Sequence, residues 1–244
     1  MSSAPLVRLL GDAAALDLPP PRQDMAERLS QWLSAVDAVK VHGALQSIQA
    51  LGQEPPPPPP LRPVLPAHLV ADVQKVRAAL VADIMGTTGM KASRAAPPQR
   101  LSSTPPPPVD EDAEPDYAAY LKRYLEQQRR MEAAIGPLRT RVRQALAKGA
   151  QPLRQLAALD ALMEQTLGGR EQKLLSTVPL FLERRFEQRR QQQQQPPTQW
   201  RQPGGWLHGF GQEWQAALLA ELDLRLQPVL GLMDAFNNEI SKQP

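Results

Sequence analysis

The longest helical pattern in the chain begins at Asp116. Apolar residues then recur at alternating spacings of four and three, which is typical of a helix that packs along one seam. Polar Gln128 is the single exception. The apolar positions are Tyr117, Leu121, Tyr124, Met131, Ile135, Leu138 and Val142. The spacing predicts a long helix that needs a partner helix.

Gly136 and Pro137 fall in the middle of this pattern. A proline inside a helix removes one backbone donor and clashes with the preceding turn. The seam nevertheless stays in phase through Leu138 and Val142. We therefore expect a kink at this point and not a break.

Two more helices are predicted after the first. Gly149 and Pro152 mark a stop and a restart. The second helix is expected to close at Gly168-Gly169. A third is expected from Arg170 to about Arg190, with Pro179 as a possible bend. The three helices together make a central block over residues 116–190.

The C-terminal segment, residues 206–244, carries one more helical stripe. The stripe consists of Trp214, Leu218, Leu222, Leu226, Val229, Met233 and Phe236. Pro228 is expected to kink this helix, by the same argument as Pro137. Its apolar stripe makes it the natural partner of the central seam.

The remaining chain divides by composition. Residues 1–52 predict a small unit of short helices. Residues 53–115 are a proline-rich linker that encloses a helix at about 67–85, and residues 191–205 are a connector rich in Gln, Pro and Gly.

The residue usage favours helix over sheet. Leu and Ala dominate a hydrophobic fraction of 42%, and aromatic residues supply only 5%. Good helix formers are abundant, whereas runs of β-branched residues are nearly absent. We predict an all-α fold: a helical bundle with a coiled-coil-like central helix, interrupted by proline-rich disordered linkers.

Cysteine is absent from the 244 residues, so disulfides and thiolate chemistry are excluded. The segment from Met1 to Leu18 has one basic residue and an apolar run cut by Gly11 and Asp12, which makes it a poor signal peptide. No window approaches the roughly 18 apolar residues of a membrane span. These features predict a soluble, cytoplasmic protein.

The positive charge is concentrated in one part of the chain. The net charge is +3, yet residues 117–190 hold 15 Lys and Arg against 7 Asp and Glu. Such a basic face suits nucleic acid, an acidic protein or an anionic membrane surface, and a solvated helix surface is the simpler interpretation. The candidate contacts to phosphate or to an acidic partner are Arg184, Arg185, Arg189 and Arg190.

No pattern in the sequence predicts catalysis. His42, His68 and His208 are far apart, and only His68 has a potential ligand at helical spacing, Asp72. The segment 85–91 superficially suggests a phosphate loop, but it lacks the Gly-Lys-Ser/Thr ending and follows a helix. We therefore predict no catalytic, cofactor or metal site and no enzymatic activity. An enzyme would need a pocket formed by helices distant in sequence.

Three segments carry a family resemblance: 28–33, 175–186 and 219–230, which include Leu175-Ser176-Thr177-Val178-Pro179 and Glu183-Arg184-Arg185-Phe186. They resemble an uncharacterised proteobacterial protein family of about this length, a domain of unknown function. The resemblance implies no activity and no catalytic residues. Because genes of that family accompany cell-envelope genes, it implies a partner linked to the envelope.

These patterns together predict a non-enzymatic helical adaptor or scaffold, linked to a cell-envelope complex, that acts through helix–helix contacts with a protein partner or a second copy. The alternative is a basic nucleic-acid-associated protein that uses the arginine-rich face of 170–190. The spacing leaves open whether the partner seam closes within one chain or between chains. The predicted partner seam comprises Tyr117, Leu121, Tyr124, Met131, Leu222, Leu226 and Val229.

Overall fold

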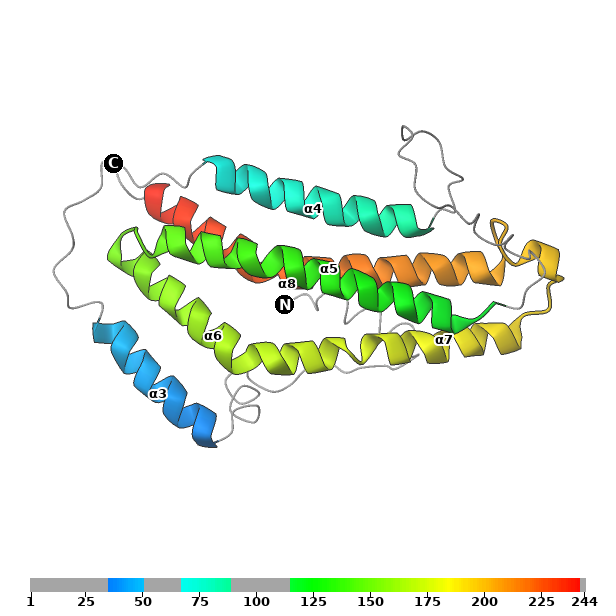
Figure 1. The fold of residues 1–244 in the computed structure, drawn as a ribbon, viewed down its shortest axis with the longest axis horizontal. Coiled ribbons are helices and arrows are strands. Elements are labelled where there is room, and N and C mark those ends of the chain that lie inside the picture. Colours follow the sequence, from blue (N-terminus) through cyan, green and yellow to red (C-terminus); the bar gives the residue numbers. More distant parts are fainter. Residues whose placement is uncertain (1–34, 51–66, 89–114, 242–244) are drawn as a thin grey trace, which may run out of the picture.

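The computed structural model describes residues 35–50, 67–88 and 115–241. Within these ranges the chain forms helices and no strand, which confirms the predicted all-α class (Figure 1). The elements are α3 (Ala35–Ala50), α4 (Ala67–Thr88), α5 (Tyr117–Leu146), α6 (Gln151–Leu175), α7 (Val178–Gln192), a 3-10 turn (Pro197–Gln199) and α8 (Trp206–Ser241).

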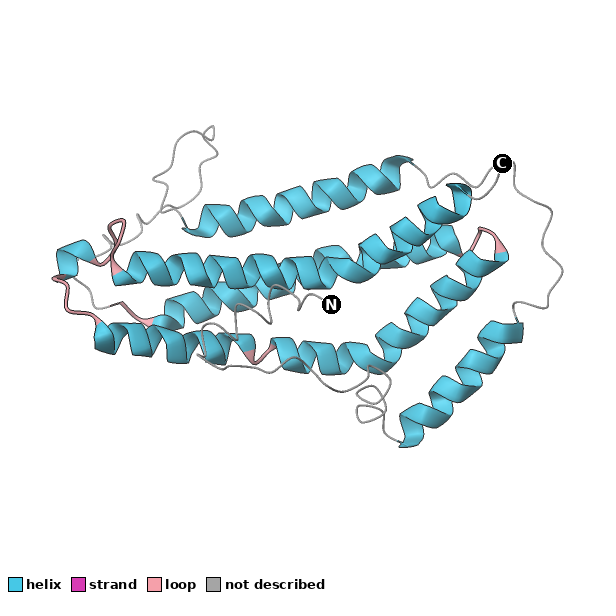
Figure 2. Cartoon of the chain, turned by 180° about the vertical axis from the view of Figure 1, so that it is seen from behind, coloured by secondary structure: helices cyan, strands magenta, loops and turns pink. Residues whose placement is uncertain are grey.

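Helices α5 and α8 lie side by side at the centre of the molecule, and this pair has the most extensive packing in the fold. Helix α4 covers one side of the pair. Helices α6 and α7 run along the opposite side, nearly end to end (Figures 1 and 2). Helix α3 packs mainly on α6. The α5–α8 pair is therefore the platform that positions the other helices.

Helix α5 begins where the sequence supplies a cap. Asp116 has extended backbone angles, and its carboxylate accepts a 2.9 Å hydrogen bond from the backbone N–H of Ala118. This contact satisfies one of the free donors of the first turn. The helix then continues through Pro137 to Leu146 without interruption. The prediction that Pro137 does not break the helix is confirmed.

The predicted boundary at Gly168-Gly169 is wrong. Helix α6 continues through both glycines to Leu175, and the chain breaks at Ser176 and Thr177. A glycine costs a helix only about 1 kcal/mol, which packing on α5 and α8 outweighs. Pro179 lies in the first turn of α7, where its missing N–H costs no hydrogen bond. It starts a helix instead of bending one.

The Gln/Pro/Gly connector forms an ordered turn at one end of the bundle. The indole Nε1 of Trp200 donates to the carbonyl of Gln195 at 2.8 Å. The backbone N–H groups of Leu207 and His208 both donate to the carbonyl of Trp200 at 3.1 Å. The positive φ of Gly204, 89°, completes the reversal. Helix α8 then begins at Trp206, at the predicted boundary.

The N-terminal half is described in part. The helix predicted at about 67–85 is present as α4, which extends to Thr88. The first part of the segment that superficially suggested a phosphate loop, residues 85–88, therefore continues this helix. The predicted helices before residue 35, and the linker segments 51–66 and 89–114, lie outside the described residues.

Candidate functional site

The predicted partner seam is closed within a single chain. Its α5 residues face its α8 residues in one hydrophobic core, and all are buried except Leu121, which is partly buried. These side chains form the core of the bundle and do not offer a free surface to a partner. The core residues concerned are Tyr117, Leu121, Tyr124, Met131, Leu222, Leu226 and Val229.

Gln128, the one polar residue in the α5 part of that seam, faces a fully buried carboxylate. Glu221 of α8 is 0% exposed. It accepts hydrogen bonds from Tyr124 Oη at 2.9 Å and from Gln128 Nε2 at 3.0 Å. The guanidinium of Arg225, one turn further along α8, pairs with Glu221 Oε1 at 2.9 Å. Each carboxylate oxygen therefore has at least two donors.

This network determines how three helices meet. A buried charge is tolerated only when it is paired and hydrogen-bonded, so Glu221 requires these neighbours at their observed positions. Burial, together with the charge of Glu221 and its hydrogen bond, raises the pKa of Tyr124, which stays a neutral donor. Gln128 also donates to the carbonyl of Leu175 at 3.2 Å. The last turn of α6 is thus connected to the α5–α8 pair.

Helix α4 packs in the groove between α5 and α8. Four of its apolar side chains, at spacings of four, seven and four, are nearly or fully buried. These are Leu69, Val73, Leu80 and Ile84, of which Ile84 is 0% exposed. The groove therefore receives one face of an amphipathic helix, which is a recurrent mode of peptide recognition.

Ion pairs line the α5 edge of this groove. Asp72 pairs with Arg141 at 3.1 Å, and Asp83 pairs with Arg130 at 3.4 Å. Eleven positions separate the two acids along α4, and eleven separate the two arginines along α5 in the opposite direction. The two helices are therefore antiparallel and matched in register.

The α8 edge shows the same match. Arg77 pairs with Asp223 at 3.2 Å, and Gln215 Nε2 lies 2.7 Å from Met85 Sδ. Eight positions separate the contacts on each helix, again in opposite directions. Because the side chains of Arg77 and Asp223 are about half exposed, this pair lies at the rim of the groove.

Three of the four predicted phosphate contacts are engaged in ion pairs. Arg185 and Arg189 both pair with Glu213 of α8, and Arg190 pairs with Glu187 at 3.1 Å. Burial alone would raise the pKa of Glu213, but the hydrogen bonds from Arg189 and Arg185 lower it. Arg185 and Arg189 therefore connect α7 to α8, whereas the pair of Arg190 lies within α7.

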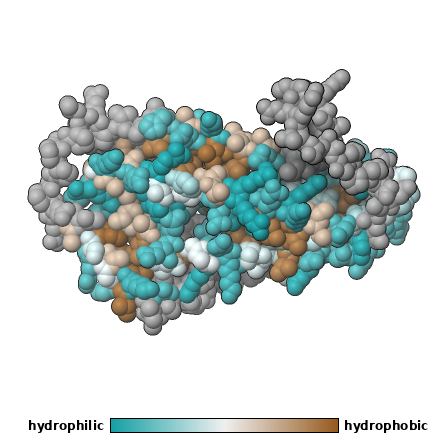
Figure 3. Space-filling model, viewed as in Figure 1, coloured by the Kyte–Doolittle hydropathy of each residue, from teal (hydrophilic) through white to brown (hydrophobic). Residues whose placement is uncertain are grey.

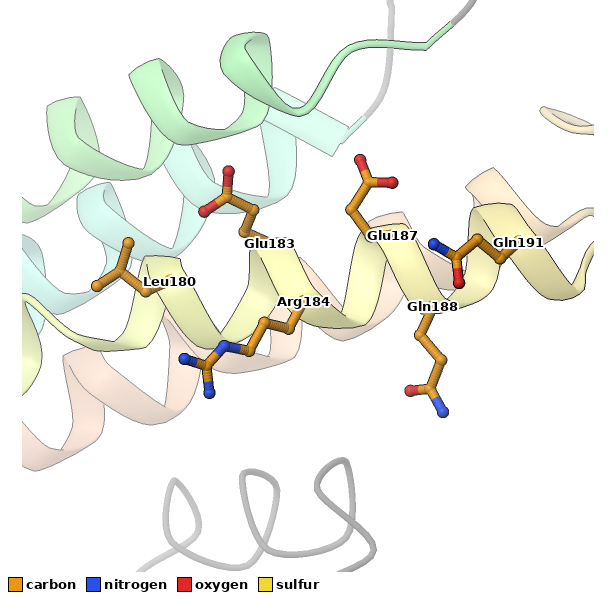
Figure 4. A pocket seen from close by; sticks show the side chains of 6 residues that line it. All are labelled: Leu180, Glu183, Arg184, Glu187, Gln188 and Gln191. Atoms are coloured by element: carbon orange, nitrogen blue, oxygen red, sulfur yellow. The ribbon is translucent and has the colours of Figure 1, made fainter.

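The fourth, Arg184, lies on the outer face of α7. It belongs to a set of exposed and partly exposed side chains around a surface depression: Leu180, Glu183, Arg184, Glu187, Gln188 and Gln191. All six come from one helix, and they point in several directions (Figure 4). They do not converge on a point where a substrate atom would react.

The described histidines have simple surroundings. His42 contacts Gln46 at 3.0 Å within α3. Asp72, the potential ligand one turn from His68, pairs with Arg141 instead. Within residues 35–50, 67–88 and 115–241, no group of three or more His, Asp or Glu is placed to hold a metal ion. None of the helices in these ranges has the length and apolar composition to cross a bilayer.

Apolar side chains reach the surface in separate patches between polar ones (Figure 3). The largest exposed fractions belong to Val39 of α3, Leu180 of α7, and Leu174 and Met85. Single exposed apolar residues are common on soluble proteins. The α5–α8 groove differs from these patches because a helix with matched charges lies in it.

Residues 1–238 match the family described as protein of unknown function, DUF3348. The chain belongs to the DUF3348 family. This match confirms the resemblance to an uncharacterised family and covers nearly the whole chain. The chain has no match among curated proteins or among solved structures.

Proposed function

We propose that this DUF3348 protein is a non-enzymatic helical adaptor or scaffold, and that the α5–α8 groove is the surface through which it binds a helix of a protein partner. One observation carries the proposal: α4 lies in this groove between two long connecting segments, residues 51–66 and 89–114. Its position is therefore supported by side-chain contacts along the groove more than by a short loop.

The groove has the two elements of helix recognition. Buried apolar side chains such as Leu80 and Ile84 supply the favourable burial of surface. Charged pairs at the rim, including Asp83 with Arg130, supply orientation and partner choice. The family resemblance supports the part of the proposal that links this adaptor to a cell-envelope complex.

The alternative, a nucleic-acid-associated protein, has less support. Phosphate binding needs cations that are available to exchange counterions. Arg185, Arg189 and Arg190 are instead paired with carboxylates. Arg184→Glu tests the one remaining predicted phosphate contact. If the chain binds RNA or DNA with a salt-dependent affinity and Arg184→Glu abolishes this binding, the alternative is favoured.

The adaptor proposal is tested by measuring whether a separate helical peptide binds the α5–α8 groove. The full-length chain with Val73→Asp and Leu80→Asp places two charges on the apolar face of its own α4 and opens the groove. A labelled synthetic peptide of residues 67–88 is then titrated by fluorescence anisotropy. We expect saturable binding, and no binding by the same peptide carrying both Asp substitutions. An opened chain that keeps its near-UV circular dichroism but does not bind the peptide would refute the proposal.

A further inference from the structure

Resting on this proposed function, we infer that α4 is a tethered, displaceable occupant of the α5–α8 groove, and that the partner displaces it with an amphipathic helix of the same charge order. That order is acidic groups facing Arg141 and Arg130 of α5, and a basic group facing Asp223 of α8.

The charges of α4 lie on two edges of its apolar face. At 100° per residue, Asp72 and Asp83 lie on the same edge of the stripe that contains Val73 and Leu80, and Arg77 lies on the other edge. The acidic edge meets the arginines of α5, and the basic edge meets Asp223 of α8.

This arrangement selects the direction of a bound helix. A helix turned end for end in the groove would place its acidic edge against Asp223 and its basic edge against Arg130 and Arg141. Like charges facing one another across an interface oppose binding. The exposed pairs contribute little to affinity. They act on orientation and partner choice, while the buried apolar side chains supply affinity.

Helix α4 differs from the other helices of the core in how it is attached. Only residues 147–150 separate α5 from α6, and only Ser176 and Thr177 separate α6 from α7. By contrast, residues 89–114 connect α4 to α5. A connection of 26 residues can reach roughly 3.3–3.6 Å per residue when fully extended. Its length therefore does not hold α4 in the groove.

The same tether sets a threshold for the partner. Because α4 belongs to the same chain as the groove, its docking is intramolecular and has an effective concentration that a separate helix must overcome. A partner helix at micromolar concentration must therefore dock better than α4, or α4 must first be weakened. The groove is thus protected from helices that match it poorly.

The first experiment compares four states of the full-length chain as targets for the 67–88 peptide. Because the chain has no cysteine, Met85→Cys with Gln215→Cys introduces a single pair of thiols on the two sides of the α4–α8 contact. A bifunctional methanethiosulfonate reagent bridges the pair through one disulfide at each end, which gives the oxidised state, and reduction cleaves both disulfides. The other three states are wild type, the reduced cysteine variant, and the opened Val73→Asp, Leu80→Asp chain.

We expect the opened chain to bind the peptide at least about tenfold more tightly than wild type, because its own α4 no longer competes. The oxidised variant should not bind, and reduction should restore wild-type affinity. Equal affinity for the opened, wild-type and oxidised chains would overturn displacement. A folded opened chain without any binding would refute the adaptor proposal itself, so the two failures are distinguishable.

The second experiment tests the charge order. A peptide with Asp72→Arg and Asp83→Arg should bind the opened chain at least about tenfold more weakly than the native peptide, because it brings cations against Arg130 and Arg141. Adding Arg130→Asp and Arg141→Asp to the opened chain should restore binding. A reversed peptide that binds both chains equally would overturn the inferred charge order.

Discussion

Tyr124 Oη donates a 2.9 Å hydrogen bond to Glu221 Oε2, and this carboxylate is fully buried between α5 and α8. A leucine at position 221 would extend the apolar stripe of α8. The carboxylate instead requires donors at defined positions on the facing helix. Sliding α5 by one turn would change the pair of donors that faces Glu221, and in one direction it would bring Glu132 to the position of Gln128, so the network favours the observed register of the two helices.

The first prediction concerns this carboxylate. Glu221→Ala leaves Arg225 and two neutral donors without their acceptor inside the core. We expect the free energy of unfolding to fall by about 3–5 kcal/mol, the range for removing one partner of a buried ion pair. Tyr124→Phe removes a single hydrogen bond and should cost about 1–3 kcal/mol. Urea denaturation followed by tryptophan fluorescence measures both.

A matched triple variant separates charge from packing. Glu221→Leu with Arg225→Met and Tyr124→Phe replaces the ion pair and its phenol donor by apolar side chains of similar size, and such a replacement of an ion pair is often neutral or stabilising. This variant should recover most of the stability lost in Glu221→Ala. A cost below about 1 kcal/mol for Glu221→Ala would contradict the role given to the network.

The second prediction uses the three tyrosines of the chain, all of which lie in α5. Burial raises the pKa of Tyr117, Tyr120 and Tyr124 above the ordinary value of 10.0, and the charges of Glu183 and Glu221 add to the rise at Tyr117 and Tyr124. Unfolded tyrosines ionise near pH 10 while the folded ones stay neutral. Stability is therefore complete below pH 10 and falls as the pH rises above it.

Near-UV absorbance of tyrosinate measures this directly. The native chain should develop the signal at higher pH than the same chain in concentrated urea. Tyr124→Phe should remove one of the shifted phenols from the native titration. Superimposable native and unfolded titration curves would contradict the burial of these phenols.

The sequence was informative about helices because their causes are local. The four-and-three spacing of α5 acts within a few turns and predicted the helix, and the cap at Asp116 is equally local although it was not predicted. The boundary at Gly168-Gly169 was predicted wrongly because its outcome is decided by packing: α6 packs on α5, α8 and α3. Local propensity of about 1 kcal/mol per glycine does not decide against such contacts.

The contacts of the candidate site could not be predicted as well as the helices, because they join residues that are far apart in the sequence. Glu221 meets Tyr124 and Gln128 from a distant part of the chain. Two signals in the sequence could have found it, although neither was used: polar Gln128 inside an apolar seam, and Arg225 one turn after Glu221 beside the apolar stripe of α8. The ion pairs of Asp72 and Asp83 gave no local signal, since their partners lie on α5.

The third prediction concerns how the stability of the protein at low pH depends on Glu213. The hydrogen bonds from Arg189 and Arg185 hold the pKa of Glu213 below its ordinary value of 4.5, against the opposing effect of burial. The stabilisation is therefore fully present above pH 4.5 and is lost as the pH falls through the lowered pKa. The urea midpoint of wild type should decline below pH 4.5 more steeply than that of Glu213→Gln. Parallel curves for the two proteins would contradict this assignment.

The fourth prediction compares two glycines. A Cβ at Gly205 would lie 2.2 Å from the carbonyl oxygen of Gln199 and 2.3 Å from that of Trp200, so backbone must move. Gly205→Ala should therefore destabilise the chain by about 1–3 kcal/mol. Gly231 lies in α8 with open space around it. Gly231→Ala should stabilise by about 0.5–1 kcal/mol, and equal effects at both sites would contradict the close packing of the turn.

The last prediction compares two ion pairs of different burial. Arg139 donates from Nε and Nη2 to the two oxygens of Asp160, at 2.9 and 2.6 Å. Its side chain is 13% exposed and that of Asp160 is 10% exposed, whereas Arg77 and Asp223 are 54% and 48% exposed. Coulombic attraction is weakly screened in the first pair and strongly screened in the second.

Asp160→Asn should therefore reduce the free energy of unfolding by about 1–3 kcal/mol, because it removes the bidentate partner of a largely buried guanidinium and leaves it the longer 3.5 Å contact with Glu164. Asp223→Asn should cost less than about 1 kcal/mol, as exposed pairs do. Added salt should narrow the difference in the free energy of unfolding between wild type and Asp223→Asn. The difference between wild type and Asp160→Asn should stay nearly unchanged. Equal costs would mean that the α5–α6 pair is hydrated in solution, and the bidentate contact would then not hold these two helices together.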